Sequence, residues 1–196
     1  VGITDLGKLS SLKKIGGNLT ILNNPLQSLN GLQGLKKVQN LSLERLPELV
    51  SLEGLNNLEQ IDGTLYITRC NSLKNLNALS NVSIINGKID FHILDELESI
   101  EGLSNVRSPV AGIELSFLPS LESIQAFRNL ERVPGIKLSL EYLANLSSLE
   151  GLEGYQTMNR LYLRELTNLP NISPLSDLTN VDTDLYLREL PSLSSI

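Results

Sequence analysis

The chain has 196 residues, the usual length of one domain and enough to bury a substantial core. Hydrophobic residues make up 41% of it, but only 4% are aromatic and tryptophan is absent, so aliphatic side chains must build the interior. A formal net charge of −6 argues against a nucleic-acid partner, because such partners need a basic surface. No apolar run approaches the roughly 20 residues of a membrane-spanning helix, so we expect no membrane insertion.

An internal repeat of about 24 residues runs along the chain. Each unit opens with two apolar residues separated by one residue, which is the alternation of a strand with one buried face. The pairs begin at Leu19, Leu41, Leu65, Ile89, Ile113, Ile136, Leu161 and Leu185. A single unit cannot bury its apolar edge alone, so the units are expected to stack and their strands to form one parallel sheet.

Four apolar columns follow each pair at intervals of about three residues, which predicts the corners of a flattened coil. The first column contains Leu26, Leu49, Leu73, Leu97, Leu121 and Leu169. In the sixth unit we assign Leu146, Leu149 and Leu152 to the second, third and fourth columns. With that assignment Glu153–Asn159 is longer than its counterparts, which predicts a bulged loop there.

Small polar residues also recur in register. Serine or asparagine precedes the second apolar column, where it can satisfy backbone groups at a bend. These residues are Ser28, Ser51, Asn75, Ser99, Ser123, Asn145, Asn171 and Ser195. Gly31, Gly54 and Gly102 mark a close approach of neighbouring backbone. Asn57, Asn81, Asn105 and Asn129 form a further column at a predicted turn. We interpret all three columns as structural.

The repeat unit Gly-x-Leu-x-Ile-x-x-x-Pro-x-Leu-x-Ser-Leu-x-Gly-Leu-x-Asn-Leu-x-x-Ile resembles the leucine-rich repeats of receptor L-domain-like proteins. Residues 17–25 and 46–58 carry the resemblance most clearly, and it covers essentially the whole chain. It implies a leucine-rich repeat solenoid, a right-handed superhelix of about 24-residue coils that is mainly parallel β with short turns or 3-10 segments. Residues 1–196 are therefore expected to form one solenoid domain. Because the sequence starts and stops within a repeat, we expect a fragment of a longer protein.

Similar arrays occur in bacterial surface proteins, in fungal cell-wall proteins and, more distantly, in growth-factor receptor ectodomains. This chain lacks the disulfide-rich flanks of the receptors, because Cys70 is its only cysteine. We expect that thiol to be part-buried in a turn and without special chemistry. The resemblance implies a secreted or cell-surface binding module of bacterial type, with a protein or cell-surface polysaccharide as partner. A structural spacer with no ligand of its own is the alternative.

The candidate binding surface is the outward face of the predicted sheet, because solenoids commonly bind through such extended faces. One outward row contains Thr20, Ser42, Tyr66, Asp90, Glu114, Lys137, Tyr162 and Tyr186. The next row contains Leu22, Glu44, Thr68, His92, Ser116, Ser139, Arg164 and Arg188. Tyrosine and arginine are favoured at binding hot spots, although a repeated Tyr-x-Arg surface can also be inherited by duplication. The selected ligand-binding candidates are Tyr66, Asp90, His92, Tyr162, Arg164, Tyr186 and Arg188.

His92 is the only histidine, and Asp90 and Glu114 are expected near it. One histidine with scattered carboxylates falls short of the usual metal-ligand sets, and no trio of nucleophile, base and orienting group is evident around it. Phosphate-binding loops, dinucleotide fingerprints and calcium-loop spacing are absent from the sequence. We therefore expect no enzyme activity, no catalytic residue, no cofactor and no metal.

Overall fold

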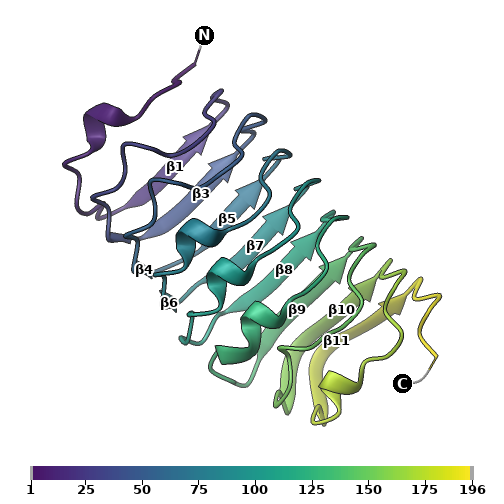
Figure 1. The fold of residues 1–196 in the computed structure, drawn as a ribbon. Coiled ribbons are helices and arrows are strands. Elements are labelled where there is room, and N and C mark those ends of the chain that lie inside the picture. Colours follow the sequence, from purple (N-terminus) through teal and green to yellow (C-terminus); the bar gives the residue numbers. More distant parts are fainter. Residues whose placement is uncertain (1, 195–196) are drawn as a thin grey trace.

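The computed structural model describes residues 2–194 and winds them into a parallel β-solenoid with coils about 24 residues apart, as predicted (Figure 1). Eight strands form one parallel sheet in the order β1-β3-β5-β7-β8-β9-β10-β11. They are β1 (Asn18–Leu22), β3 (Asn40–Glu44), β5 (Leu65–Thr68), β7 (Lys88–His92), β8 (Gly112–Ser116), β9 (Ile136–Glu141), β10 (Thr157–Arg164) and β11 (Asn180–Arg188). Each coil thus contributes one strand, stacked on the strand of the coil before it.

Shorter elements lie between these strands. A second parallel sheet, which the sequence did not predict, has the order β2-β4-β6 and consists of β2 (Lys37–Val38), β4 (Gln60–Ile61) and β6 (Ile84–Ile85). The predicted 3-10 segments are η1 (Gly7–Leu9), η2 (Asn77–Leu79), η3 (Glu101–Leu103), η4 (Gln125–Asn129) and η5 (Ser173–Leu175). Within residues 2–194 none of these short helices has the length or hydropathy to span a bilayer.

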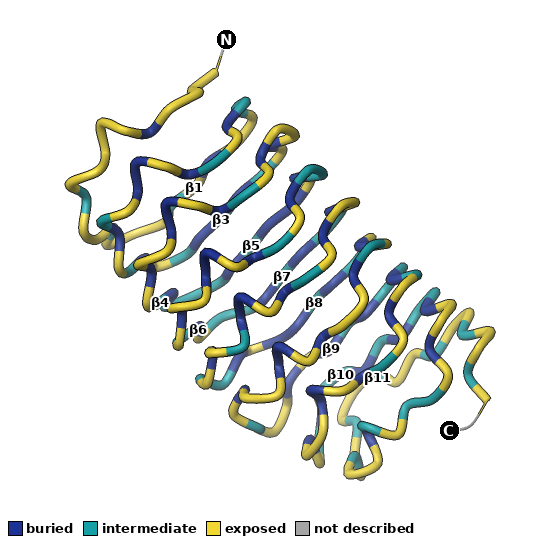
Figure 2. Tube along the Cα trace, viewed as in Figure 1, coloured by how far each residue is buried: buried dark blue, intermediate teal, exposed yellow. Residues whose placement is uncertain are grey.

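The core runs the length of the solenoid and is built from the predicted columns. In the coil that starts with β5, both inward strand residues, Leu65 and Ile67, have no exposed surface. The same holds for Leu73, Leu76 and Leu79, which follow the strand. Figure 2 shows these buried positions recurring along the inside of successive coils. Tyr66, which lies between Leu65 and Ile67 on the outward side, is not part of this core.

Strand β9 corrects the predicted register of the sixth unit. Leu138 of β9 pairs with Ile113 of β8 and with Leu161 of β10, so the apolar pair of this unit is Leu138 and Leu140. The prediction that the pair begins at Ile136 is wrong. Ile136 is itself buried, and three alternating apolar residues allow a slip of two positions that keeps the same face inward.

The apolar columns of the sixth coil shift with the strand. The Leu146 N–H donates to the Leu143 carbonyl, as Leu121 donates to Leu118 in the preceding coil, so Leu146 belongs to the first column. Leu149 and Leu152 then move to the second and third columns. The fourth position is occupied by Tyr155, which is 2% exposed. The predicted assignment placed these three leucines one column too far along.

The predicted bulged loop at Glu153–Asn159 is a bulge within a strand. Strand β10 already begins at Thr157. Its register shifts between Met158 and Arg160 against both neighbours. Asn159 is the extra residue against β9, whereas the extra residue against β11 lies on β11, between Val181 and Asp184. The excess length of this segment came from the misassigned columns, and the genuine irregularity is confined to the sheet.

The polar columns are hydrogen-bonded as expected. Ser51 Oγ accepts from the Glu53 N–H at 3.0 Å. In the sixth coil Ser148, not Asn145, has this role and accepts from the Glu150 N–H at 3.0 Å. The predicted member Ser195 lies outside the described residues. The asparagine amides donate to carbonyls of the preceding coil at 2.6–2.8 Å, from Asn57, Asn81, Asn105 and Asn129.

Candidate functional site

The outward sheet face carries all seven candidate residues, in two separate groups. Tyr66, Asp90 and His92 lie on β5 and β7, whereas the tyrosine and arginine pairs lie on β10 and β11. Strands β8 and β9 lie between the groups. In β9 the outward residues of the two rows are Ser139 and Glu141, which pair with Glu114 and Ser116. The predicted row members Lys137 and Ser139 were wrong by the same two-residue slip.

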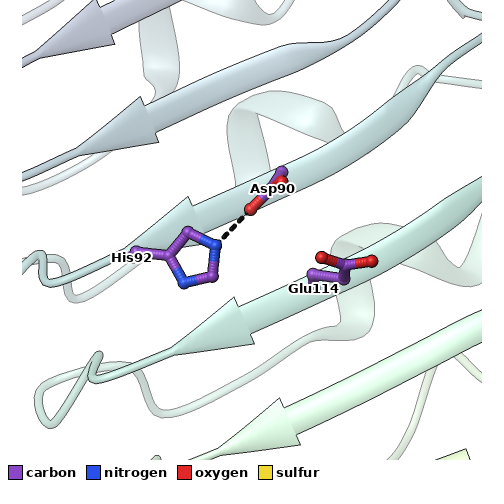
Figure 3. A group of neighbouring side chains, drawn as sticks. All are labelled: Asp90, His92 and Glu114. Atoms are coloured by element: carbon purple, nitrogen blue, oxygen red, sulfur yellow. Dashed lines mark ion pairs between the residues drawn. The ribbon is translucent and has the colours of Figure 1, made fainter.

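Asp90 and His92 of the first group join Glu114 and Ser116 of β8 in a cluster that we call the histidine cluster. His92 Nε2 lies 2.5 Å from Asp90 Oδ1, and its Nδ1 hydrogen-bonds Ser116 Oγ. Asp90 pairs in register with Glu114 on β8, and Figure 3 shows the three charged side chains side by side. The sequence placed these groups on one face. The structure brings His92 into contact with Asp90 and Ser116. It also places a Glu114 oxygen within 4.8 Å of polar atoms of Asp90 and His92.

Charge and burial set the protonation of the cluster. Contact with the Asp90 carboxylate raises the pKa of His92, burial opposes the rise, and the charges of Glu114 and Glu141 add to it. The side chain of Asp90 is only 16% exposed. Its Oδ1 atom is buried, and His92 Nε2 is its one close polar partner among the described residues. Lys88 Nζ lies 2.5 Å from Glu114 Oε1 and forms an ion pair there.

Ser116, His92 and Asp90 form a chain of nucleophile, base and carboxylate that the sequence reasoning did not find. Acyl transfer also needs donors aimed at the developing oxyanion. The backbone N–H groups nearest in sequence, those of Ile93 and Phe117, are already donated to the carbonyls of Ser116 and Glu141. Neither of these two N–H groups is therefore free to stabilise an oxyanion beside Ser116.

A corner column, missed from the sequence, follows the sheet at the C-terminal ends of its strands. Its members have φ between 51° and 57°, a left-handed conformation that costs a non-glycine residue about 1–2 kcal/mol. They are Asn23, Arg45, Arg69, Ile93, Phe117, Tyr142, Glu165 and Glu189. The signal in the sequence is position, because each member lies four residues after the first residue of the apolar pair in its coil, which is Leu138 in the sixth coil.

A shallow pocket lies where the corner column meets the histidine cluster. It has a volume of about 340 Å³, and its lining includes Arg45, Arg69, Tyr66 and His92. The two arginines form no ion pair with any residue in the described range 2–194. The Tyr66 and His92 rings meet edge to face at 6.2 Å. This part of the face thus offers positive charge in an otherwise acidic protein.

The second group is a tyrosine–arginine array, which combines predicted residues with members of the corner column. The array consists of Phe117, Tyr142, Arg160, Tyr162, Arg164, Tyr186 and Arg188. Phe117 and Tyr142 stack with ring centroids 4.3 Å apart, and the Arg164 guanidinium lies 4.8 Å from the Tyr142 centroid. Arg160 lies 4.9 Å from the Tyr162 centroid, and the Tyr162 and Tyr186 rings are 5.2 Å apart.

Carboxylates at the edge of the array offset its arginines. Arg164 Nη1 lies 3.9 Å from Glu141 Oε2, and Arg188 Nη2 lies 3.0 Å from Glu189 Oε1. Hydrogen bonds to Tyr186, the larger effect, and to Glu189 raise the pKa of Arg188. The neighbouring Glu189 raises the pKa of Glu165, whereas the pKa of Glu189 itself is lowered by its contacts with Glu165 and Arg188.

A larger cavity of about 790 Å³ lies away from both groups, inside the C-terminal coil. Its lining includes Leu175 and Leu185, and Leu185 is 60% exposed although its register partner Leu161 is buried. Its apolar walls, including Leu161, Leu175 and Leu187, are members of the core or pack against it, so the apolar part of this cavity continues the core.

Comparisons with protein-family models, with characterised proteins and with solved structures found no match to this chain. The assignment to the parallel β-solenoids therefore rests on the repeat and on the strand pairing.

Proposed function

We propose that this chain is a non-enzymatic binding module that engages a protein or glycan partner through the outward face of its eight-stranded sheet. The observation that carries the proposal is the tyrosine–arginine array. Aromatic and arginine side chains are enriched at interface hot spots. Because stacking already fixes these rings, the array loses little side-chain entropy when it binds a partner.

The leucine-rich character of the repeat supports a place for this module outside the cytoplasm. The repeat resembles that of receptor L-domain-like proteins, which favours a secreted or cell-surface protein of bacterial type. Solenoid folds commonly present an extended face to their partners, which supports binding through the sheet. A structural spacer is the second candidate. It is favoured by Tyr162 and Arg164 pairing in register with Tyr186 and Arg188, as expected of a surface copied with the repeat.

The experiment is a binding screen of the purified chain against surface polysaccharides and surface proteins, followed by two variants. Tyr162→Ala and Arg188→Ala should each lower the affinity for a ligand of the array by about 5- to 30-fold, the range of moderate hot spots. Arg107→Ala is the matched control, because Arg107 is exposed, lies outside the strands and forms no ion pair with residues 2–194.

The outcomes separate the candidates. A ligand that binds both variants as tightly as the parent chain removes the array from the proposal. A screen without any ligand supports the spacer. Robust turnover of a substrate that disappears in His92→Ala would overturn the non-enzymatic assignment.

A further inference from the structure

We propose that Asp90, His92 and Glu114 bind a divalent transition-metal ion of the Zn²⁺ class. One ligand atom from each residue lies within 4.8 Å of the other two. Tetrahedral zinc with ligands at about 2.0–2.2 Å places those ligands roughly 3.4 Å from one another. The side chains therefore need only a small adjustment to converge on one ion.

The strands hold these side chains in place. Asp90 and His92 are two residues apart on β7 and so project from the same face. Glu114 stands directly opposite Asp90 on β8 (Figure 3). Sites built on paired strands are more precise than sites on loops, because the backbone cannot move one ligand independently.

Two features of the cluster are explained better by a bound cation than by an ordinary ion pair. The buried Oδ1 of Asp90 faces His92 Nε2 at 2.5 Å and has no other polar partner within residues 2–194. The other ring nitrogen, Nδ1, is hydrogen-bonded to Ser116 Oγ. Metal-binding histidines characteristically hydrogen-bond through their second nitrogen, which fixes the ring and turns the free lone pair toward the metal.

The ligand set also defines the class of ion. One imidazole and two carboxylates suit zinc and similar divalent ions, whereas the absence of thiolate disfavours soft metals. Three protein ligands leave a coordination position open to water or to an oxygen atom of another molecule. This inference does not depend on the tyrosine–arginine array or on the function proposed for it.

Substitution of Lys88 is expected to change metal affinity in the opposite direction to substitution of a ligand. Its Nζ forms an ion pair with Glu114 Oε1 at 2.5 Å and places a positive charge beside the site. A bound divalent ion is repelled by that charge and competes for that carboxylate. Removing the lysine charge should therefore strengthen metal binding, whereas removing any ligand should weaken it.

The test is calorimetric titration of the chelator-stripped chain with Zn²⁺, with circular dichroism as the check on folding. We expect about one ion per chain. Loss of a supporting hydrogen bond typically lowers metal affinity by about 10- to 100-fold, which is the expectation for Ser116→Ala. His92→Gln and Asp90→Asn remove ligands and should exceed that loss. Lys88→Met should bind more tightly than the parent chain.

A control and a second readout keep the test decisive. Asp184→Asn removes the same charge from another ion pair of the sheet and should bind Zn²⁺ like the parent. His92 is the only histidine, so its ring signals in the NMR spectrum of the unaltered chain should shift on saturation with Zn²⁺. Unshifted ring signals, or Zn²⁺ affinity that is the same in His92→Gln, would overturn the proposal. Covalent labelling of Ser116 by a fluorophosphonate would also overturn it, in favour of a nucleophilic serine.

Discussion

Gly54 lies at a close approach between neighbouring coils, and its replacement by alanine tests how tightly the coils are stacked. Its φ is +109°, and an added Cβ would lie 1.9 Å from the carbonyl oxygen of Leu29. That backbone is held in place, because the Leu29 N–H donates to the Glu53 carbonyl at 2.8 Å. Backbone strain of about 1–3 kcal/mol and overpacking of about 1–3 kcal/mol together predict a loss of roughly 2–6 kcal/mol in the free energy of unfolding.

Two other glycines separate these contributions. Gly135 has φ +81° but no atom within 4 Å of an added Cβ, so Gly135→Ala should cost only the strain of about 1–3 kcal/mol. Gly17 has neither feature, and Gly17→Ala should leave stability unchanged or raise it by about 0.4–1 kcal/mol. Urea unfolding followed by circular dichroism measures all three. If Gly54→Ala is no less stable than Gly135→Ala, the close approach of the coils does not limit this position.

Three further predictions concern single side chains. Burial raises the pKa of the Cys70 thiol to about 11, so iodoacetamide at about pH 8 should modify it only after unfolding. Keeping this thiol neutral in the folded chain adds stability that is complete below its unfolded pKa of about 8.5 and should be lost as the pH rises through about 11. Alkylation of the native chain at about pH 8 would contradict the burial and the raised pKa of this thiol. Phe117→Ala removes the stack on Tyr142 and should cost about 0.5–1.5 kcal/mol in urea unfolding; no loss would mean that the stack adds nothing to stability. Asn105→Ala removes the amide donor to the Ser80 carbonyl and should cost about 0.5–1.5 kcal/mol; an unchanged midpoint would show the asparagine column to be dispensable there.

The period and the inward face of the coils could be predicted because a slip of one residue would expose a whole apolar set. The same logic fails where apolar residues alternate three times in succession. Ile136, Leu138 and Leu140 all face inward, so a slip of two residues costs no burial. Only the pairing of β9 with β8 and β10 decides between the registers. Burial was also underestimated at Cys70, which has no exposed surface because the chain turns at Arg69 and carries the next residue into the core.

The candidate site was predictable as a face but not as a set of contacts. Alternation places Asp90 and His92 outward, and the stacking of equal units places Glu114 beside them. It does not show that the His92 ring turns back toward Asp90, because that depends on side-chain torsions. Tyr142 and Phe117 were missed because they follow their strands, at corners where a left-handed residue reverses the chain. The period-two alternation of a strand ends before those corners, so it does not predict where the corner side chains lie.

The two proposed sites are separable because the solenoid transmits structure mainly between adjacent coils. His92 lies on β7 and Arg188 on β11, four strand spacings apart, or roughly 19 Å at about 4.8 Å each. Substitutions more than about 7–10 Å apart with no shared partner usually have additive effects. The double variant His92→Gln with Arg188→Ala should therefore bind Zn²⁺ like His92→Gln alone and bind the array's ligand like Arg188→Ala alone. If adding Zn²⁺ strengthens ligand binding in the parent chain but not in His92→Gln, one partner spans both sites, and the sheet face acts as a single extended surface.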